Sequence, residues 1–147
     1  MRKVMILNGP NLNMLGTREP EVYGSETLKD IQALCDQAAT PLLIKLDFRQ
    51  SNHEGELVSA IQEAGSHADG LIINPAGFGH TSVALLDALL SIKIPAIEVH
   101  LSNIYKREEF RHHTYTARAV RAVISGLGSF GYRLAIEALA DIFKKNA

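Results

Sequence analysis

The hydrophobic and polar positions along the chain alternate between two periods. Short apolar runs predict strands over residues 3–7, 42–48, 70–74, 95–99 and 120–125. Apolar residues at helical spacing predict helices from a cap at Ser25 or Thr27 to about Ala39, and over residues 54–65, 81–92 and 130 to about 144. A further helical turn is expected over residues 107–111. Alternating strands and helices are typical of an α/β fold with a parallel sheet.

Five strands in a chain of this length favour a flavodoxin-like three-layer sandwich, a five-stranded parallel sheet with helices on both faces. We expect one catalytic domain over residues 1–147. Polar clusters follow four of the predicted strands, at residues 8–11, 49–54, 74–82 and 98–103. Because such sheets bind ligands beyond the carboxyl ends of their strands, a site is expected there.

Charge and cysteine content narrow the function classes. The 15 Lys and Arg residues nearly balance the 16 Asp and Glu residues, so the net charge of -1 argues against nucleic-acid and membrane-surface binding. Cys35 is the single cysteine, which excludes an internal disulfide and a cysteine-based metal cage. No apolar run is long enough to span a bilayer, and the apolar start ends at Asn8 as a strand would. A reducing cytoplasm is the expected location.

Two sequence patterns resemble those of a dinucleotide site and of a metal site, but the rest of the sequence does not fit either. Residues 126–131 fit the G-x-G-x-x-G pattern, but too few residues follow for the strand and acidic residue of a dinucleotide site. A tight turn with close strand–helix packing is the preferred interpretation. The six histidines, His112 and His113 included, lack the spacing of a metal site. We therefore expect no cofactor and no metal.

The stretch over residues 9–24 shows little regular pattern and contains Arg18 and Tyr23. Tyrosine is a weak base at neutral pH because its ordinary pKa is about 10, and a neighbouring guanidinium lowers that pKa. The pair is therefore a candidate base and activator. On spacing alone, a tyrosine packed on a loop near an exposed arginine is the commoner arrangement.

His100 directly follows a predicted strand, and Glu98 lies on the same strand face. A histidine at this edge can transfer a proton near neutral pH, although a histidine bonded only to a neighbouring loop remains an alternative. The backbone of Leu101 and Ser102 can hold a carboxylate.

Other polar residues near the carboxyl edge of the predicted sheet also have two possible interpretations. Asn11 and Asn74 end strands, where asparagine is also a common turn residue. Arg107 and Arg111 lie one helical turn apart and either face a cleft or form a solvated face with Glu108.

Read together, these segments resemble the type II 3-dehydroquinate dehydratases over nearly the whole chain. The matching stretches are residues 8–12, 16–20 with 23–24, 50–56, 74–75, 80–82, 98–103, 107–111, and 126–128 with 131–132. The resemblance implies reversible dehydration of 3-dehydroquinate to 3-dehydroshikimate through an enolate, without metal or Schiff base.

The resemblance also implies catalytic roles. Tyr23 is expected to be the base at C2, with Arg18 activating it. His100 is expected to be the acid at the C1 hydroxyl, supported by Glu98. Asn11 is expected to help hold the enolate oxygen through a water.

It further implies binding roles. Asn74 and the backbone of Leu101 and Ser102 are expected to bind the substrate carboxylate, while His80 and Arg111 bind ring hydroxyls. Asp87 is expected to reach a neighbouring subunit's site, in a dodecamer built from trimers.

Three other classes of protein fit the sequence less well. A flavin- or nucleotide-binding flavodoxin-like module would use the same edge without the tyrosine, arginine and histidine chemistry. A signalling receiver needs an acidic cluster after the first strand, where residues 8–11 supply none. A hydrolase of the G-x-S-x-G type lacks its motif.

Overall fold

The computed structural model describes residues 1–17 and 24–146. Its sheet has five strands in the order β2-β1-β3-β4-β5, with every neighbouring pair parallel. The strands are β1 (Arg2–Asn8), β2 (Ile44–Gln50), β3 (Gly70–Asn74), β4 (Ala96–His100) and β5 (Ala122–Ser125). This order confirms the flavodoxin-like expectation.

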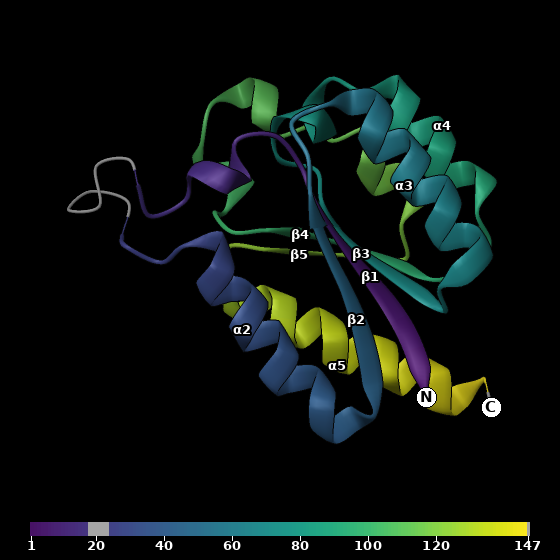
Figure 1. The fold of residues 1–147 in the computed structure, drawn as a ribbon. Coiled ribbons are helices and arrows are strands. Elements are labelled where there is room, and N and C mark those ends of the chain that lie inside the picture. Colours follow the sequence, from purple (N-terminus) through teal and green to yellow (C-terminus); the bar gives the residue numbers. More distant parts are fainter. Residues whose placement is uncertain (18–23, 147) are drawn as a thin grey trace.

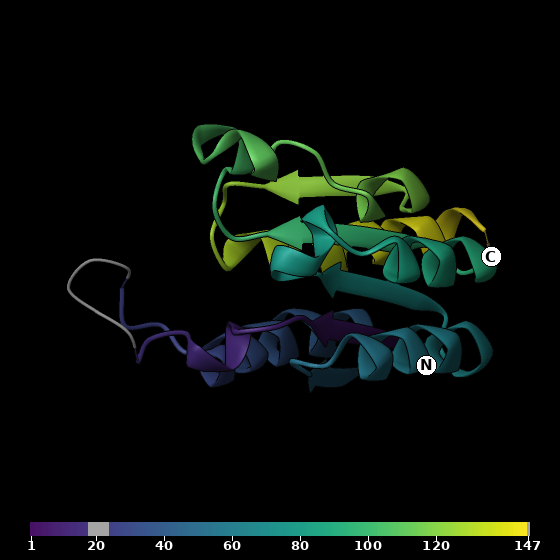
Figure 2. The same cartoon turned by 90° about the horizontal axis from the view of Figure 1, so that it is seen from above.

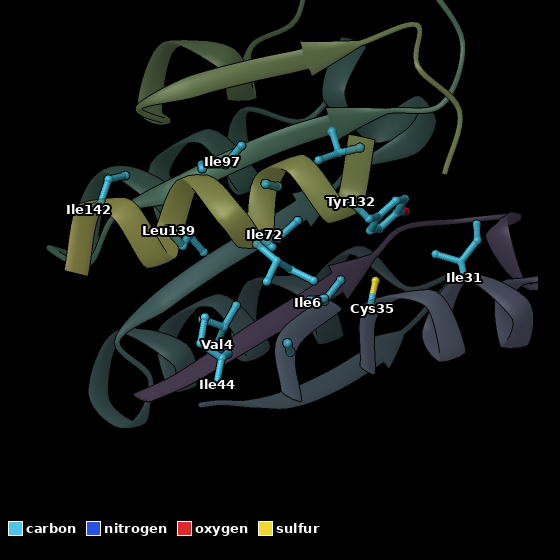
Figure 3. Packing of buried hydrophobic residues seen from close by; sticks show 14 residues of the cluster. Val4, Ile6, Ile31, Cys35, Ile44, Ile72, Ile97, Tyr132, Leu139 and Ile142 are labelled. Atoms are coloured by element: carbon cyan, nitrogen blue, oxygen red, sulfur yellow. The ribbon is translucent and has the colours of Figure 1, made fainter. Parts of the chain in front are cut away.

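Helices cover both faces of the sheet. The helices α2 (Leu28–Ala39) and α5 (Phe130–Lys145) lie on one face, and α3 (Glu54–His67) and α4 (Val83–Ser91) lie on the other (Figure 1). Each face has its own apolar core because side chains alternate along a buried strand. Val4, Ile6 and Ile72 pack toward α2 and α5 (Figure 3), whereas Met5, Leu7 and Leu71 pack toward α3 and α4.

Local sequence explains where the helices begin. The Thr27 side chain accepts from the Asp30 backbone N–H, and the Asp30 carboxylate accepts from the Thr27 backbone N–H. These hydrogen bonds hold the pKa of Asp30 below its ordinary value. Ser82 caps α4 through the Leu85 N–H, so that helix begins at Val83 rather than at the predicted residue 81.

Several predicted strand ends differ from the structure by one or two residues, and one predicted helical turn is absent. The second strand starts at Ile44 rather than residue 42, because Leu43 has a left-handed backbone (φ 57°) after a short turn over Thr40–Leu42. The fifth strand starts at Ala122 rather than residue 120, because a 3₁₀ turn occupies Thr116–Ala119 and pairing with β4 begins at Ala122, opposite Ile97. Residues 107–111 do not form one turn: 3₁₀ turns cover Ile104–Lys106 and Glu109–Arg111, and Arg107 between them is extended.

The strands all point the same way, so their carboxyl ends share one edge of the sheet (Figure 2). Among the described residues, no helix is long and apolar enough to cross a membrane.

Candidate active site

A polar residue ends every strand at the carboxyl edge of the sheet. These residues are Asn8, Gln50, Asn74, His100 and Ser125, in strands β1 to β5. The register aligns Asn8 with both Gln50 and Asn74, and His100 with Ser125. The edge at which the sequence predicts a site therefore has a hydrogen-bonding side chain at the end of each of the five strands.

His100 and Glu98 form a buried pair on the α3 and α4 side of β4. Nε2 of His100 lies 2.6 Å from Oε2 of Glu98. Since a carboxylate only accepts, this nitrogen carries the proton. Glu98 is fully buried and His100 is 5% exposed. Glu98 and His100, which the sequence predicts to act together, are thus in direct contact.

Two threonines hold the Glu98 carboxylate from the segment between β4 and β5. Thr114 Oγ1 donates to Oε2 at 3.0 Å, and Thr116 Oγ1 donates to Oε1. Thr116 is fully buried. A buried carboxylate is costly unless its oxygens accept hydrogen bonds, and here both do. The resulting group of Glu98, His100, Thr114 and Thr116 is called the carboxylate network below.

A second buried group lies on the α2 and α5 side of the same edge. The Tyr132 hydroxyl donates to Asn8 Oδ1 at 2.6 Å and accepts from Asn74 Nδ2 at 3.0 Å. Asn8 Nδ2 donates to the Arg49 carbonyl at 2.9 Å, and Asn74 Oδ1 accepts from the Ala76 N–H at 3.1 Å. Asn8, Asn74 and Tyr132 are called the amide network below.

Sequence reasoning assigned no role to Tyr132, Thr114 or Thr116. Tyr132 lies on the apolar face of α5 with Ala135, Ile136 and Leu139, so its pattern reads as core. The threonines lie in an irregular segment without periodicity. The only sequence signal was the Gly131-Tyr132 pair within the family resemblance.

Asn11 lies just beyond β1 and is exposed, with a left-handed backbone (φ 70°). Its N–H donates to Asn52 Oδ1 at 2.9 Å, which ties it to the loop after β2. The preceding Gly9 N–H donates to the Asn74 carbonyl at 2.8 Å. A Cβ at Gly9 would lie 2.5 Å from the Pro75 carbonyl oxygen, so this close approach of the two loops requires glycine.

His80 stacks on His100 with ring centroids 6.1 Å apart, and its Nδ1 donates to the His113 carbonyl at 2.8 Å. Beside His80 and Thr114 lies a hollow of about 560 Å³, also lined by Tyr105, Phe110 and His112. A hollow of about 500 Å³ over β2 and α3 lies away from the site residues.

The remaining predicted binding residues lie apart from these networks. Arg111 donates from Nε to Glu108 at 3.1 Å, and Arg107 lies 3.7 Å from the same carboxylate, which matches the alternative of a charged face. Leu101 and Ser102 follow β4, and their carbonyls accept from Gly128 N–H and Ser125 Oγ. Asp87 is exposed on α4.

Arg18 and Tyr23 lie outside the described residues. Over residues 1–17 and 24–146, no three His, Cys, Asp or Glu side chains gather as a metal site.

The glycine-rich segment at residues 126–131 is a turn, as the sequence indicated. Gly126 has φ 93°, and a Cβ there would lie 3.0 Å from that of Asn103. A Cβ at Gly131 would lie 3.3 Å from side-chain carbons of Ile124 and Val99. The glycines therefore serve a tight turn and close packing of α5 on the sheet.

Comparison with known proteins identifies a single family. The family model for class II dehydroquinases matches residues 2–140. A 3-dehydroquinate dehydratase of Bartonella henselae is 58% identical over 143 residues, covering 97% of both chains. One from Streptomyces avermitilis is 57% identical over 140 residues, covering 95% of this chain and 88% of the other.

Solved structures agree with these relatives. The type II dehydroquinase of Butyrivibrio crossotus superposes with a TM-score of 0.90 at 42% identity, covering 94% of this chain and 97% of that one. The enzyme of Propionibacterium acnes gives a TM-score of 0.91 at 40% identity, covering 96% and 97%. These likenesses favour the dehydratase interpretation over a flavin-binding module.

Proposed function

The chain belongs to the class II dehydroquinase family, and from this premise we propose how its residues carry out the family's reaction. The protein catalyses the dehydration of 3-dehydroquinate to 3-dehydroshikimate. A base removes a proton from C2, beside the ketone, and an enolate forms. The C1 hydroxyl then leaves as water after taking a proton from an acid. The observation that carries the proposal is the buried His100–Glu98 pair at the edge where this fold binds ligands.

His100 is the proposed acid. Its Nε2 proton is held by Glu98, which leaves Nδ1 to face a substrate group. A carboxylate against the imidazole stabilises the protonated ring, which is the form that can donate to the leaving hydroxyl. The two threonines support this role because they keep the Glu98 oxygens aligned.

Tyr23 is the proposed base and Arg18 its activator, on the match of residues 16–20 and 23–24 to the family. An unperturbed phenol with a pKa of about 10 is deprotonated in roughly one molecule in a thousand at pH 7. A guanidinium beside it raises that fraction about tenfold for each unit by which the pKa falls. Arginine suits the role because it keeps its own charge.

The remaining residues bind the substrate. Asn11 helps hold the enolate oxygen through a water, where fixed donors stabilise developing charge. Asn74, with the backbone of Leu101 and Ser102, binds the carboxylate. His80 and Arg111 bind ring hydroxyls. The stacking of His80 on His100 supports its place in the site.

The experiment follows the conjugated enone of the product by its absorbance after 3-dehydroquinate is added. Activity that survives both a chelator and borohydride supports a route without metal or Schiff base; loss of activity with either contradicts it. Tyr23→Phe is expected to lose nearly all turnover while the protein stays folded by circular dichroism. Substantial remaining turnover in this variant would remove Tyr23 as the base.

We propose that the protein is one catalytic domain that self-associates into trimers and a dodecamer. Val83 and Leu90 are exposed apolar residues on α4, and Asp87 lies between them in the chain, at a spacing that shares one helix face. Burial of this face would bring Asp87 to a neighbouring copy's site. Sedimentation equilibrium tests this: a dodecamer mass is expected, and a monomer at working concentration would overturn it. We also propose a cytoplasmic location, since a chain with a single cysteine uses no internal disulfide.

A further inference from the structure

We propose that Tyr132 is a positioning residue for substrate binding, which fixes the direction of the Asn74 amide so that one of its N–H groups is presented to the substrate carboxylate. The inference rests on the proposed role of Asn74. Tyr132 itself touches no substrate, because it is fully buried beneath the edge of the sheet.

The first argument is the direction in which the amide network must run. The Arg49 carbonyl can only accept, so the group of Asn8 that faces it at 2.9 Å must be its NH₂. The Asn8 oxygen therefore faces Tyr132 and can only accept from it. The hydroxyl proton is committed to Asn8, and the hydroxyl oxygen is left to accept from Asn74 at 3.0 Å.

The second argument comes from the opposite end of the network. The Ala76 N–H can only donate, so the group of Asn74 that faces it at 3.1 Å must be its oxygen. The two ends are independent, and both place the NH₂ of Asn74 toward Tyr132. A flipped Asn74 amide would set oxygen against the hydroxyl oxygen and NH₂ against the Ala76 N–H, leaving both contacts without a hydrogen bond.

The third argument is that the side-chain amide of Asn74 has a second N–H group available as a hydrogen-bond donor. An amide nitrogen carries two hydrogens, and within the described chain Asn74 Nδ2 donates only to Tyr132. Asn74 is 3% exposed and ends β3 at the edge of the sheet, so its second N–H is left for a ligand. A carboxylate is a fitting acceptor, because it only accepts and forms strong hydrogen bonds.

The fourth argument is the rigidity of the hydroxyl. The Tyr132 ring lies among Ile6, Ile31 and Cys35, between α5, α2 and the sheet (Figure 3). Burial raises the pKa of Tyr132, so the phenol stays neutral and keeps the proton that it donates to Asn8. The hydroxyl is thus a fixed point against which the Asn74 amide is oriented.

The test compares steady-state kinetics of Tyr132→Phe, Asn74→Ala and the double variant with 3-dehydroquinate. Tyr132→Phe is expected to raise KM about tenfold, in line with the loss of one well-aligned hydrogen bond to a charged group, and to change kcat less than about twofold. In the Asn74→Ala background the same substitution is expected to add no further increase in KM, because its effect passes through Asn74.

Leu139→Ala is the matched control. Leu139 is fully buried in the same helix and the same apolar core, without a polar contact to the edge of the sheet. It is expected to lower the thermal midpoint at least as much as Tyr132→Phe while leaving KM unchanged. An equal rise in KM in both variants would show that Tyr132 acts only through stability, and would overturn the inference.

The outcomes separate this inference from the proposed function. An unchanged KM in Asn74→Ala would contradict the proposed role of Asn74. A raised KM in Asn74→Ala with an unchanged KM in Tyr132→Phe would overturn the inference and leave the proposed function standing.

If Tyr132→Phe does not fold, Asn8→Ala replaces it, because Asn8 fixes the hydroxyl direction. A raised KM that disappears in the Asn74→Ala background supports the inference, and an unchanged KM overturns it.

Discussion

The amide network and the carboxylate network lie at the same edge of the sheet but on opposite faces. Asn8, Asn74 and Tyr132 face α2 and α5, and they join neutral groups whose hydrogen bonds run in one fixed direction. Glu98 and His100 face α3 and α4, and they join a carboxylate to an imidazole, a side chain suited to proton transfer. The difference teaches that the proposed function places substrate binding on the face with a fixed hydrogen-bond direction, and proton transfer on the other face.

The sheet makes this separation possible because alternate residues of a strand face opposite sides. On β4, Ile97 and Val99 enter the core under α5, while Glu98 and His100 lie on the other side. On β1 and β3, the final residues Asn8 and Asn74 are neighbours in register and share the α5 side. Each network can therefore be altered without touching the other.

The largest effect is expected from His100→Ala, which removes the proposed acid. We expect kcat to fall by about 10²–10⁴-fold, the usual contribution of a positioned general acid, with a much smaller change in KM. His67→Ala is the control, since His67 is exposed at the end of α3 and is expected to change neither constant. A loss of less than about tenfold in kcat would assign the acid to another group.

Thr116→Val is expected to act more weakly, through the position of Glu98. It leaves Oε1 of Glu98 without its Thr116 donor, which costs about 1–3 kcal/mol of folding stability. A Glu98 carboxylate that is held less firmly orients His100 less well, so kcat is expected to fall, though by less than in His100→Ala. Thermal unfolding and steady-state kinetics measure the two effects.

The pH dependence of KM tests the amide network. Tyr132→Phe is expected to raise KM by the same factor at pH 6 and pH 8, because neither amides nor the phenol titrate in that range. For the carboxylate network, an unchanged kcat in Thr116→Val would contradict the positioning of Glu98 by Thr116.

The smallest effect at neutral pH is expected from Cys35→Ala. This variant tests how much the buried thiol destabilises the fold at high pH. Burial raises the pKa of the Cys35 thiol from 9.0 to about 12. The unfolded chain therefore loses this proton first, and stability is expected to fall between pH 9 and pH 12 by up to about 1.4 kcal/mol per pH unit. Urea unfolding should show a shallower decline in Cys35→Ala; an equal decline would contradict the assignment to Cys35.

Much of the fold followed from the sequence because strands and helices have distinct apolar periods. The strand over Gly70–Asn74 was predicted at its observed bounds, and the contact of His100 with Glu98 follows from their spacing on one strand. The position of the site followed from the parallel sheet itself. The roles of Arg18 and Tyr23 came from the family resemblance and remain predictions.

What the sequence could not supply depends on contacts between distant residues. Tyr132 and Asn8 are separated by 124 positions, and no local pattern marks a tyrosine whose hydroxyl meets two strand ends. Thr114 and Thr116 lie in a segment whose path is set by packing against α4 and β4, so their contact with Glu98 has no signature in the sequence. The start of β5 depends on the 3₁₀ turn before it and on its pairing with β4, which a pattern within β5 does not reveal.

The alternation along β4 has a consequence for how this chain can change during evolution. An insertion or deletion of one residue within Ala96–His100 would shift the strand by one residue, so that the shifted side chains face the opposite side of the sheet. Val99 after an insertion, or Leu101 after a deletion, would then take the place of the imidazole, and His100 would face the aliphatic layer under α5. Substitutions that preserve volume are tolerable in this strand, but its length is not free to drift, so alignment gaps among descendants should fall outside these five residues.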